Sequence, residues 1–172
     1  MGKYILTSDS IEVDSHILYR IQAVRVIPRY CIEPGDLGGY IESEENLSHE
    51  GDAWVGDRAR VYNQAKVYRN AIACGNVTVY GNATISDSAK VFGNAQIHGD
   101  ARIHGNAIIY DDAEIYGRAT VCDYARVYGN AKIHGDAVIC DHARVYNCAL
   151  VNGRAIICGY ANVYLNRKMP GK

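Results

Sequence analysis

The sequence predicts an all-β protein, a parallel β-helix of about six triangular coils with an N-terminal β cap. Three observations support this fold class. Residues 53–166 divide into 19 hexapeptides with no insertion. The first position of the hexapeptide is Ala in 18 of them, and the third is Val or Ile in 18. The last two positions are typically Gly-Asn or Gly-Asp, residues that accept positive φ and turn the chain.

Each hexapeptide predicts a short strand followed by a turn. A six-residue period does not follow one face of an α-helix, whose repeat is 3.6 residues. In a strand, the first and third positions point to the same side, so the Ala and Val/Ile side chains are expected to fill the core. The exceptions, Ala73 and Val77, exchange a large and a small side chain and therefore nearly conserve core volume.

The segments outside the repeat are predicted to cover its ends. Residues 1–52 are interpreted as the N-terminal cap, because the first coil of a β-helix has an unpaired edge that needs cover. Their most apolar run, residues 16–27, predicts one or two strands ended by Pro28. Residues 53–166 form the repeat domain, and residues 167–172 form a short C-terminal tail that gives the last coil little cover.

The repeat also resembles a known family. The pattern Ala-x-Val-Tyr-Gly-Asn-Ala-x-Ile-His-Gly-Asp is similar to the hexapeptide repeat of left-handed β-helix proteins, which include many acyltransferases. Residues 38–42, 46–48 and 51–55 resemble uncharacterised bacterial and phage hexapeptide-repeat proteins labelled as transferases. The resemblance implies a left-handed coil. For the acyltransferases it also implies a His base and an acyl-CoA bound between neighbouring prisms of a trimer.

One face of the predicted prism carries an aromatic column. Residues 18 apart stack from coil to coil, which aligns Phe92, Tyr110, Tyr128, Tyr146 and Tyr164 beside Arg126 and Arg144. Stacking within the chain is the first interpretation. A protein or homo-oligomer interface is the second, because Tyr and Arg are typical of binding hot spots. Stacking of a nucleotide or another flat anion is the third.

A second face carries a column of thiols. It aligns Cys122, Cys140 and Cys158 beside Val138 and Ile156. Reduced cysteine behaves as a small hydrophobic residue, so this face predicts a buried subunit contact. His104 lies above these thiols and adds a residue type that binds zinc. Strand stacking places the side chains in a line, however, whereas zinc takes a tetrahedron, so no metal site is predicted.

The histidines bear on whether the protein is an enzyme. His98, His104, His134 and His142 lie in the repeat and could each act as a general base. The first three occupy the position that Tyr fills elsewhere, which is typical of surface variation. We therefore predict a non-catalytic binding or assembly module, of a phage-type host-interaction kind, without a cofactor. An acyl-CoA-dependent acyltransferase and a nucleotide-sequestering protein are the alternatives.

Composition limits the partners and the compartment. The formal net charge is −1, so nucleic acid is not an expected partner. No apolar stretch is long enough to span a membrane, and the N-terminus lacks the apolar core of a signal peptide. We therefore expect a cytoplasmic protein with reduced thiols. We also expect a homo-oligomer, for which the family resemblance favours a trimer, and a protein partner as an alternative occupant of the exposed columns.

Overall fold

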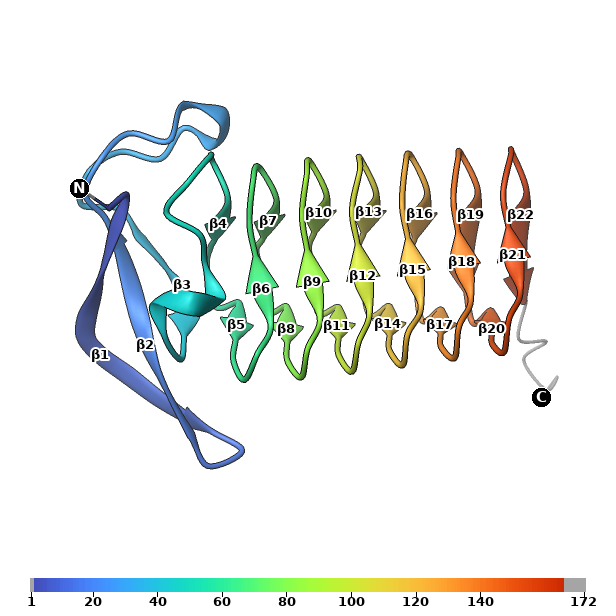
Figure 1. Ribbon diagram of the computed structural model, residues 1–172, viewed down its shortest axis with the longest axis horizontal. Helices are drawn as coiled ribbons and strands as arrows, with labels where there is room; N and C mark the ends of the chain where they lie inside the picture. The colour runs from blue at the N-terminus through green and yellow to red at the C-terminus, as the bar shows by residue number, and fades with distance from the viewer. Residues whose placement is uncertain (1, 166–172) are drawn as a thin grey trace, which may run out of the picture.

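The computed structural model, described here for residues 2–165, is an all-β solenoid of about seven turns. Figure 1 shows the turns as a row of parallel-stranded coils, with a long hairpin at the N-terminal end. This architecture confirms the prediction of an all-β protein built from stacked parallel-strand coils, with about one turn more than the six expected. The predicted tail, residues 167–172, lies outside the described residues. Among the described residues, no helix is both long enough and apolar enough to cross a membrane.

The segment before the hexapeptides contains the longest strands. They are β1 (Tyr4–Val13), β2 (His16–Ala23) and β3 (Leu37–Ile41), with two short 3-10 helices, η1 (Pro28–Tyr30) and η2 (Glu44–Asn46). Each hexapeptide then contributes one strand. These strands are β4 (Trp54–Val55), β5 (Arg60–Val61), β6 (Lys66–Val67), β7 (Ile72–Ala73), β8 (Thr78–Val79), β9 (Thr84–Ile85), β10 (Lys90–Val91), β11 (Gln96–Ile97), β12 (Arg102–Ile103), β13 (Ile108–Ile109), β14 (Glu114–Ile115), β15 (Thr120–Val121), β16 (Arg126–Val127), β17 (Lys132–Ile133), β18 (Val138–Ile139), β19 (Arg144–Asn147), β20 (Leu150–Val151), β21 (Ile156–Ile157) and β22 (Asn162–Leu165).

Every third strand pairs in parallel, which produces three sheets along the solenoid. A 7-stranded sheet runs from β4 to β22, a 6-stranded sheet from β6 to β21, and a 9-stranded sheet from β1 to β20. Val91 pairs with Ala73 on one side and with Ile109 on the other. Residues 18 apart therefore stack as the sequence predicts.

The core consists of the first and third positions of the hexapeptides. Val91, Ile97 and Ile103 are fully buried, as are Ala73 and Val77, the two residues that exchange size. Fully burying a Val or Ile side chain stabilises a protein by about 1.5–3 kcal/mol. The repeated burial of one branched side chain and one Ala per strand is therefore the main source of cohesion between coils.

The fifth position of the hexapeptide lies in the turn between strands and has a left-handed backbone conformation. Gly93 has φ +72°, and a β-carbon built there would lie 2.8 Å from the backbone N and O of Asp111. Asp111 itself adopts φ 60°. Its Oδ2 accepts a hydrogen bond from the backbone N–H of Gly129 at 3.1 Å. Asp therefore replaces Gly at this position by binding the amide of the next coil.

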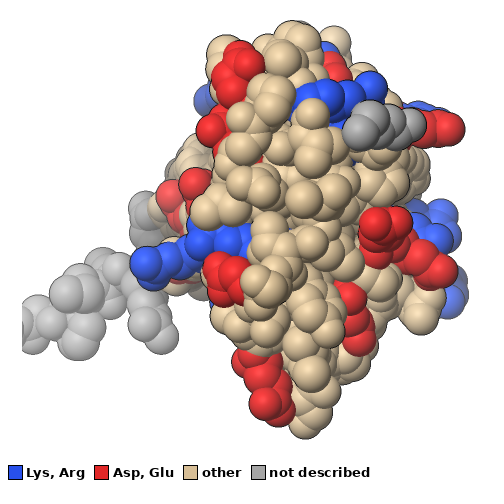
Figure 2. Space-filling model, turned by 90° about the vertical axis from the view of Figure 1, so that its left-hand side faces the viewer, with Lys and Arg blue, Asp and Glu red and all other residues tan. Residues whose placement is uncertain are grey.

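The N-terminal hairpin extends one of the solenoid sheets. Strands β1 and β2 are antiparallel, β2 is antiparallel to β3, and β3 is parallel to β5. Parallel stacking thus begins at β3, before the first hexapeptide. The segment between Leu47 and Val55 is longer than its counterpart in the next turn, between Val67 and Ala73. Figure 2 views this end of the molecule, where uncharged side chains cover the middle of the surface.

Candidate functional site

The predicted aromatic column forms a continuous stack in its C-terminal half. The ring centroids of Tyr110 and Tyr128 are 4.7 Å apart, those of Tyr128 and Tyr146 are 5.0 Å apart, and those of Tyr146 and Tyr164 are 5.1 Å apart. Phe92 is half-buried and packs against the core. Both faces of the Tyr128 and Tyr146 rings are covered by neighbouring rings, so these residues present edges and hydroxyl groups to solvent.

The two predicted arginines lie beside this stack on strands β16 and β19. Arg126 and Arg144 are in register with each other and are exposed. Within residues 2–165, neither guanidinium forms an ion pair. Both are close enough to oppose the rise that burial causes in the pKa of Tyr110. The two arginines therefore place positive charge beside the tyrosines.

A second ring stack, which the sequence analysis missed, borders the arginines on their other side. The centroids of Tyr124 and His142 are 5.1 Å apart, and those of His142 and Tyr160 are 4.9 Å apart. These residues occupy the sixth position of the hexapeptide, in the turn. Their spacing of 18 residues is visible in the sequence, and a column drawn through the turn positions would have found it.

The arginines lie on strands between the two stacks. The hollow between the turn stack and the arginines measures about 340 Å³ and is also lined by Asn162. We name the whole region the arginine–aromatic surface; it comprises Tyr110, Tyr124, Arg126, Tyr128, His142, Arg144, Tyr146, Tyr160, Asn162 and Tyr164. Its arrangement can bind a carboxylate or another anion between two rows of ring edges.

The predicted thiol column lies on the neighbouring 6-stranded sheet, across the turn stack from the arginines. Cys122 is buried, Cys140 is half-buried and Cys158 is exposed. Burial, with Asp123 alongside, raises the pKa of Cys122 to about 12. Burial and the neighbouring Asp141 also raise the pKa of Cys140. Since the thiolate is the nucleophilic form, these two thiols are poor nucleophiles at neutral pH.

The thiol face is less uniformly apolar than the sequence suggests. Asp141 lies beside the column, and its carboxylate and the sulfur atoms of Cys140 and Cys158 lie within 4.8 Å of one another. Ile156, at 68% exposure, is the most accessible apolar neighbour. Three such ligands are one short of the four that a structural zinc site uses.

The histidines of the repeat belong mostly to ring stacks. His98 lies between Tyr80 and Tyr116, with centroid distances of 4.7 and 5.0 Å. Its Nε2 is 3.4 Å from Oε1 of Glu114. His134 stacks on Tyr116 at 4.8 Å. His142 belongs to the turn stack described above. His104 instead lies beside a carboxylate, with its Nδ1 3.9 Å from Oδ2 of Asp87.

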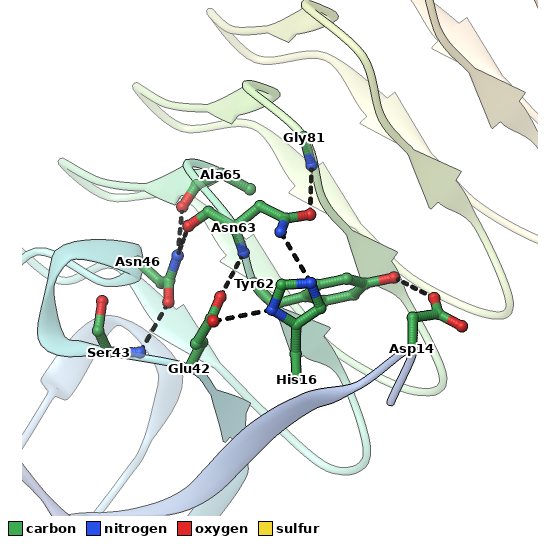
Figure 3. Close-up of polar contacts among 9 residues, drawn as sticks. All are labelled: Asp14, His16, Glu42, Ser43, Asn46, Tyr62, Asn63, Ala65 and Gly81. Atoms are coloured by element: carbon green, nitrogen blue, oxygen red, sulfur yellow. Dashed lines mark hydrogen bonds and ion pairs between the residues drawn. The ribbon is translucent and has the colours of Figure 1, made fainter. Parts of the chain in front are cut away.

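The tip of the β1–β2 hairpin joins the N-terminal end of the ring stack that contains His98. The His16 ring packs on Tyr62 at 5.3 Å, and Tyr62 stacks on Tyr80. Figure 3 shows His16 between Glu42 and Asn63, with Nδ1 2.8 Å from Glu42 and Nε2 3.1 Å from the Asn63 amide nitrogen. Because an amide nitrogen only donates, Nε2 accepts and the Nδ1 proton points to Glu42. This hydrogen bond lowers the pKa of Glu42, against the effect of burial.

Buried polar contacts hold the loop beneath the hairpin to the first regular coil. The Asn46 amide donates to the carbonyl groups of Asn63 and Ala65, both at 2.9 Å, and accepts from the Ser43 backbone N–H. The Tyr62 hydroxyl donates to Asp14 at 2.9 Å. The Asp14 hydrogen bond and the His16 contacts fix the hairpin tip against the outer face of the 9-stranded sheet (Figure 3).

No protein-family profile matches the chain, and no curated protein matches it at a significant level.

Proposed function

We propose that the protein is a non-catalytic binding module whose arginine–aromatic surface binds a carboxylate-bearing protein surface, on a second copy of the chain or on another protein. The observation that carries this proposal is the pair Arg126 and Arg144, unpaired within the described chain and flanked by two ring stacks. Arg and Tyr are the residues most often found at the centres of protein interfaces.

The ring geometry favours a protein partner over an inserted nucleotide base. Successive rings are 4.7–5.1 Å apart at their centroids. A base inserted between two rings would require about 7 Å, twice the ordinary contact distance of ~3.5 Å. The surface instead offers ring edges, phenol hydroxyl groups and guanidinium groups, which suit hydrogen bonds and ion pairs across an interface.

Acyl transfer gains no specific support from the histidines. His98, His134 and His142 each stack on aromatic neighbours, which gives them a role in cohesion between coils. The binding proposal therefore accounts for more of the repeat's outward residues than a catalytic one does.

Light scattering at micromolar concentration tests the self-association form of this proposal. We expect a species heavier than the 18.9 kDa protomer, which returns to the protomer mass in the double variant Arg126→Glu/Arg144→Glu. The matched control is Arg102→Glu, an exposed arginine on the 6-stranded sheet, which should leave the mass unchanged.

Fluorescence anisotropy with a labelled glutamate-rich peptide tests the form with a foreign partner. We expect wild type and Arg102→Glu to bind the peptide and the double variant to lose binding. A wild-type protein that stays at the protomer mass and also fails to bind the peptide would contradict the proposed function.

A further inference from the structure

Another hollow lies at the N-terminal end of the solenoid, between the hairpin tip and the outer face of the 9-stranded sheet. It measures about 510 Å³, within the range of small-molecule sites. Asp14 contributes from the hairpin. Arg60, Asn76, Thr78, Asn94 and Gln96 contribute from three successive coils. The hollow is therefore lined by residues of both the hairpin and the solenoid.

Arg60 contributes a positively charged side chain to the lining of this hollow. Its Nε is buried and has no hydrogen-bond partner among residues 2–165. A buried N–H without a partner is costly, and such groups in native proteins usually have an acceptor. A second hollow of about 260 Å³ shares Arg60 and Asn76 with the first and adds Arg58. Arg58 and Arg60 therefore both line this smaller hollow, and Arg60 and Asn76 are common to the two.

The remainder of the hollow is lined by polar groups that suit hydroxyl groups. The Asn76 amide donates to Asn94 at 3.0 Å, and the Asn94 amide donates to Asp112 at 2.9 Å, so both amides are held in fixed orientations. Thr78 adds a hydroxyl. Asp14 accepts from Tyr62 through Oδ2, which leaves its second oxygen as an acceptor.

We propose that this hollow binds a small anionic sugar. The carboxylate or phosphate group of the sugar lies at Arg58 and Arg60, where paired guanidinium groups bind either anion. The sugar hydroxyl groups bind Thr78, Asn76 and Asp14. This site is independent of the arginine–aromatic surface, because it uses the hairpin and the first three regular coils.

Isothermal titration calorimetry on the full chain tests the proposal with four compounds. Glucose 6-phosphate and glucuronate carry both features, whereas glucose lacks the anion and inorganic phosphate lacks the sugar. We expect at least one of the first two to bind measurably. Glucose and inorganic phosphate should bind about tenfold more weakly than that compound, or not at all, since each loses one set of contacts.

Three variants locate the binding. Arg60→Gln should weaken the anionic sugar by about tenfold or more, because a charge-assisted hydrogen bond is lost. Thr78→Val should weaken the sugar compound but leave inorganic phosphate unchanged. Lys66→Gln removes the same charge from an exposed position of the 6-stranded sheet and should change neither affinity. Circular dichroism confirms that each variant folds.

Three results would overturn the proposal. The first is that neither anionic sugar binds. The second is that inorganic phosphate binds as tightly as glucose 6-phosphate, which would make this an anion site only. The third is that Arg60→Gln, folded as the wild type, binds the sugar with unchanged affinity. Each result leaves the function proposed for the arginine–aromatic surface unaffected, because no residue is shared between the two regions.

Discussion

At the scale of single residues, neighbouring positions on one strand face opposite environments. In β13, Ile109 is fully buried in the core, whereas Ile108 is half-buried on the outer face. Ile108 is in register with Lys90 on one side and Arg126 on the other. An isoleucine therefore contributes differently to stability at these two adjacent positions, because strand alternation points one side chain into the core and the other outward.

The paired substitutions Ile109→Asp and Ile108→Asp test this alternation. Ile109→Asp places an unpaired charge in the dry core and should cost more than about 4 kcal/mol, enough to unfold or aggregate the protein. Ile108→Asp places a carboxylate between two cations and should change stability by less than about 1 kcal/mol. Thermal unfolding followed by circular dichroism measures both. Equal losses would show that the two faces are not distinct.

Ion pairs between coils should make stability depend on pH. A hydrogen bond from Lys132 lowers the pKa of Glu114 below 4.5, against the effect of burial and with help from His98. A carboxyl group whose pKa falls on folding stabilises the protein above the unfolded pKa, and this contribution is lost as the pH falls through the folded pKa. We expect the wild-type Tm to fall below pH 4.5 more than the Tm of Glu114→Gln. The exposed Glu12→Gln serves as the control and should follow the wild type.

At the scale of elements, the tip of the hairpin is attached to the solenoid by a small set of contacts. His16 and Asp14 are the residues that connect the tip to Tyr62, while the base of the hairpin pairs with β3. Repeat structures are stabilised mainly between neighbours. Loosening the tip should therefore open the hairpin locally and leave distant coils intact.

Hydrogen exchange on the variant His16→Ala tests this local opening. We expect amides of β1 and β2 to lose protection while those of β10 to β16 keep theirs, because sub-global opening is confined to the element that loses contacts. His134→Ala, at the opposite end of the same ring stack, is the matched control and should leave the hairpin protected. Loss of protection along the whole solenoid in His16→Ala would contradict a locally attached hairpin.

At the scale of the whole molecule, the two ends of the solenoid differ. At the N-terminal end β2 pairs with β3, which in turn pairs with β5, whereas in the last described coil Ala155, Ile157 and Val163 are only half-buried. Lateral assembly would bury the exposed columns, and the trimer remains a prediction from the family resemblance. Two faces are candidates for the contact, the arginine–aromatic surface and the thiol face.

The variants Tyr128→Glu and Cys140→Glu distinguish these two faces. A carboxylate buried at a real contact lacks a partner and should dissociate the oligomer, so only one variant should return the mass to 18.9 kDa. Light scattering measures the mass, and a trimer would have three times the protomer value. An oligomer that neither variant dissociates would place the contact elsewhere.

The sequence by itself determined the regular part of the molecule. Because one coil contains 18 residues, residues 18 apart in the sequence lie on neighbouring coils. The core positions, the sheets and the columns through Tyr128, Arg126 and Cys140 therefore follow from spacing alone. The turn stack through Tyr124, His142 and Tyr160 obeys the same spacing and was within reach of the same reasoning.

The tertiary structure determined the parts of the fold that do not follow the 18-residue period. The antiparallel pairing of β1 with β2, the longer segment between Leu47 and Val55, and the contact of His16 with Tyr62 join residues at irregular separations. Such contacts depend on how loops close and which polar groups find partners, and no local pattern encodes them. For the same reason, the hollow around Arg60 could be recognised only once the hairpin was placed over the solenoid.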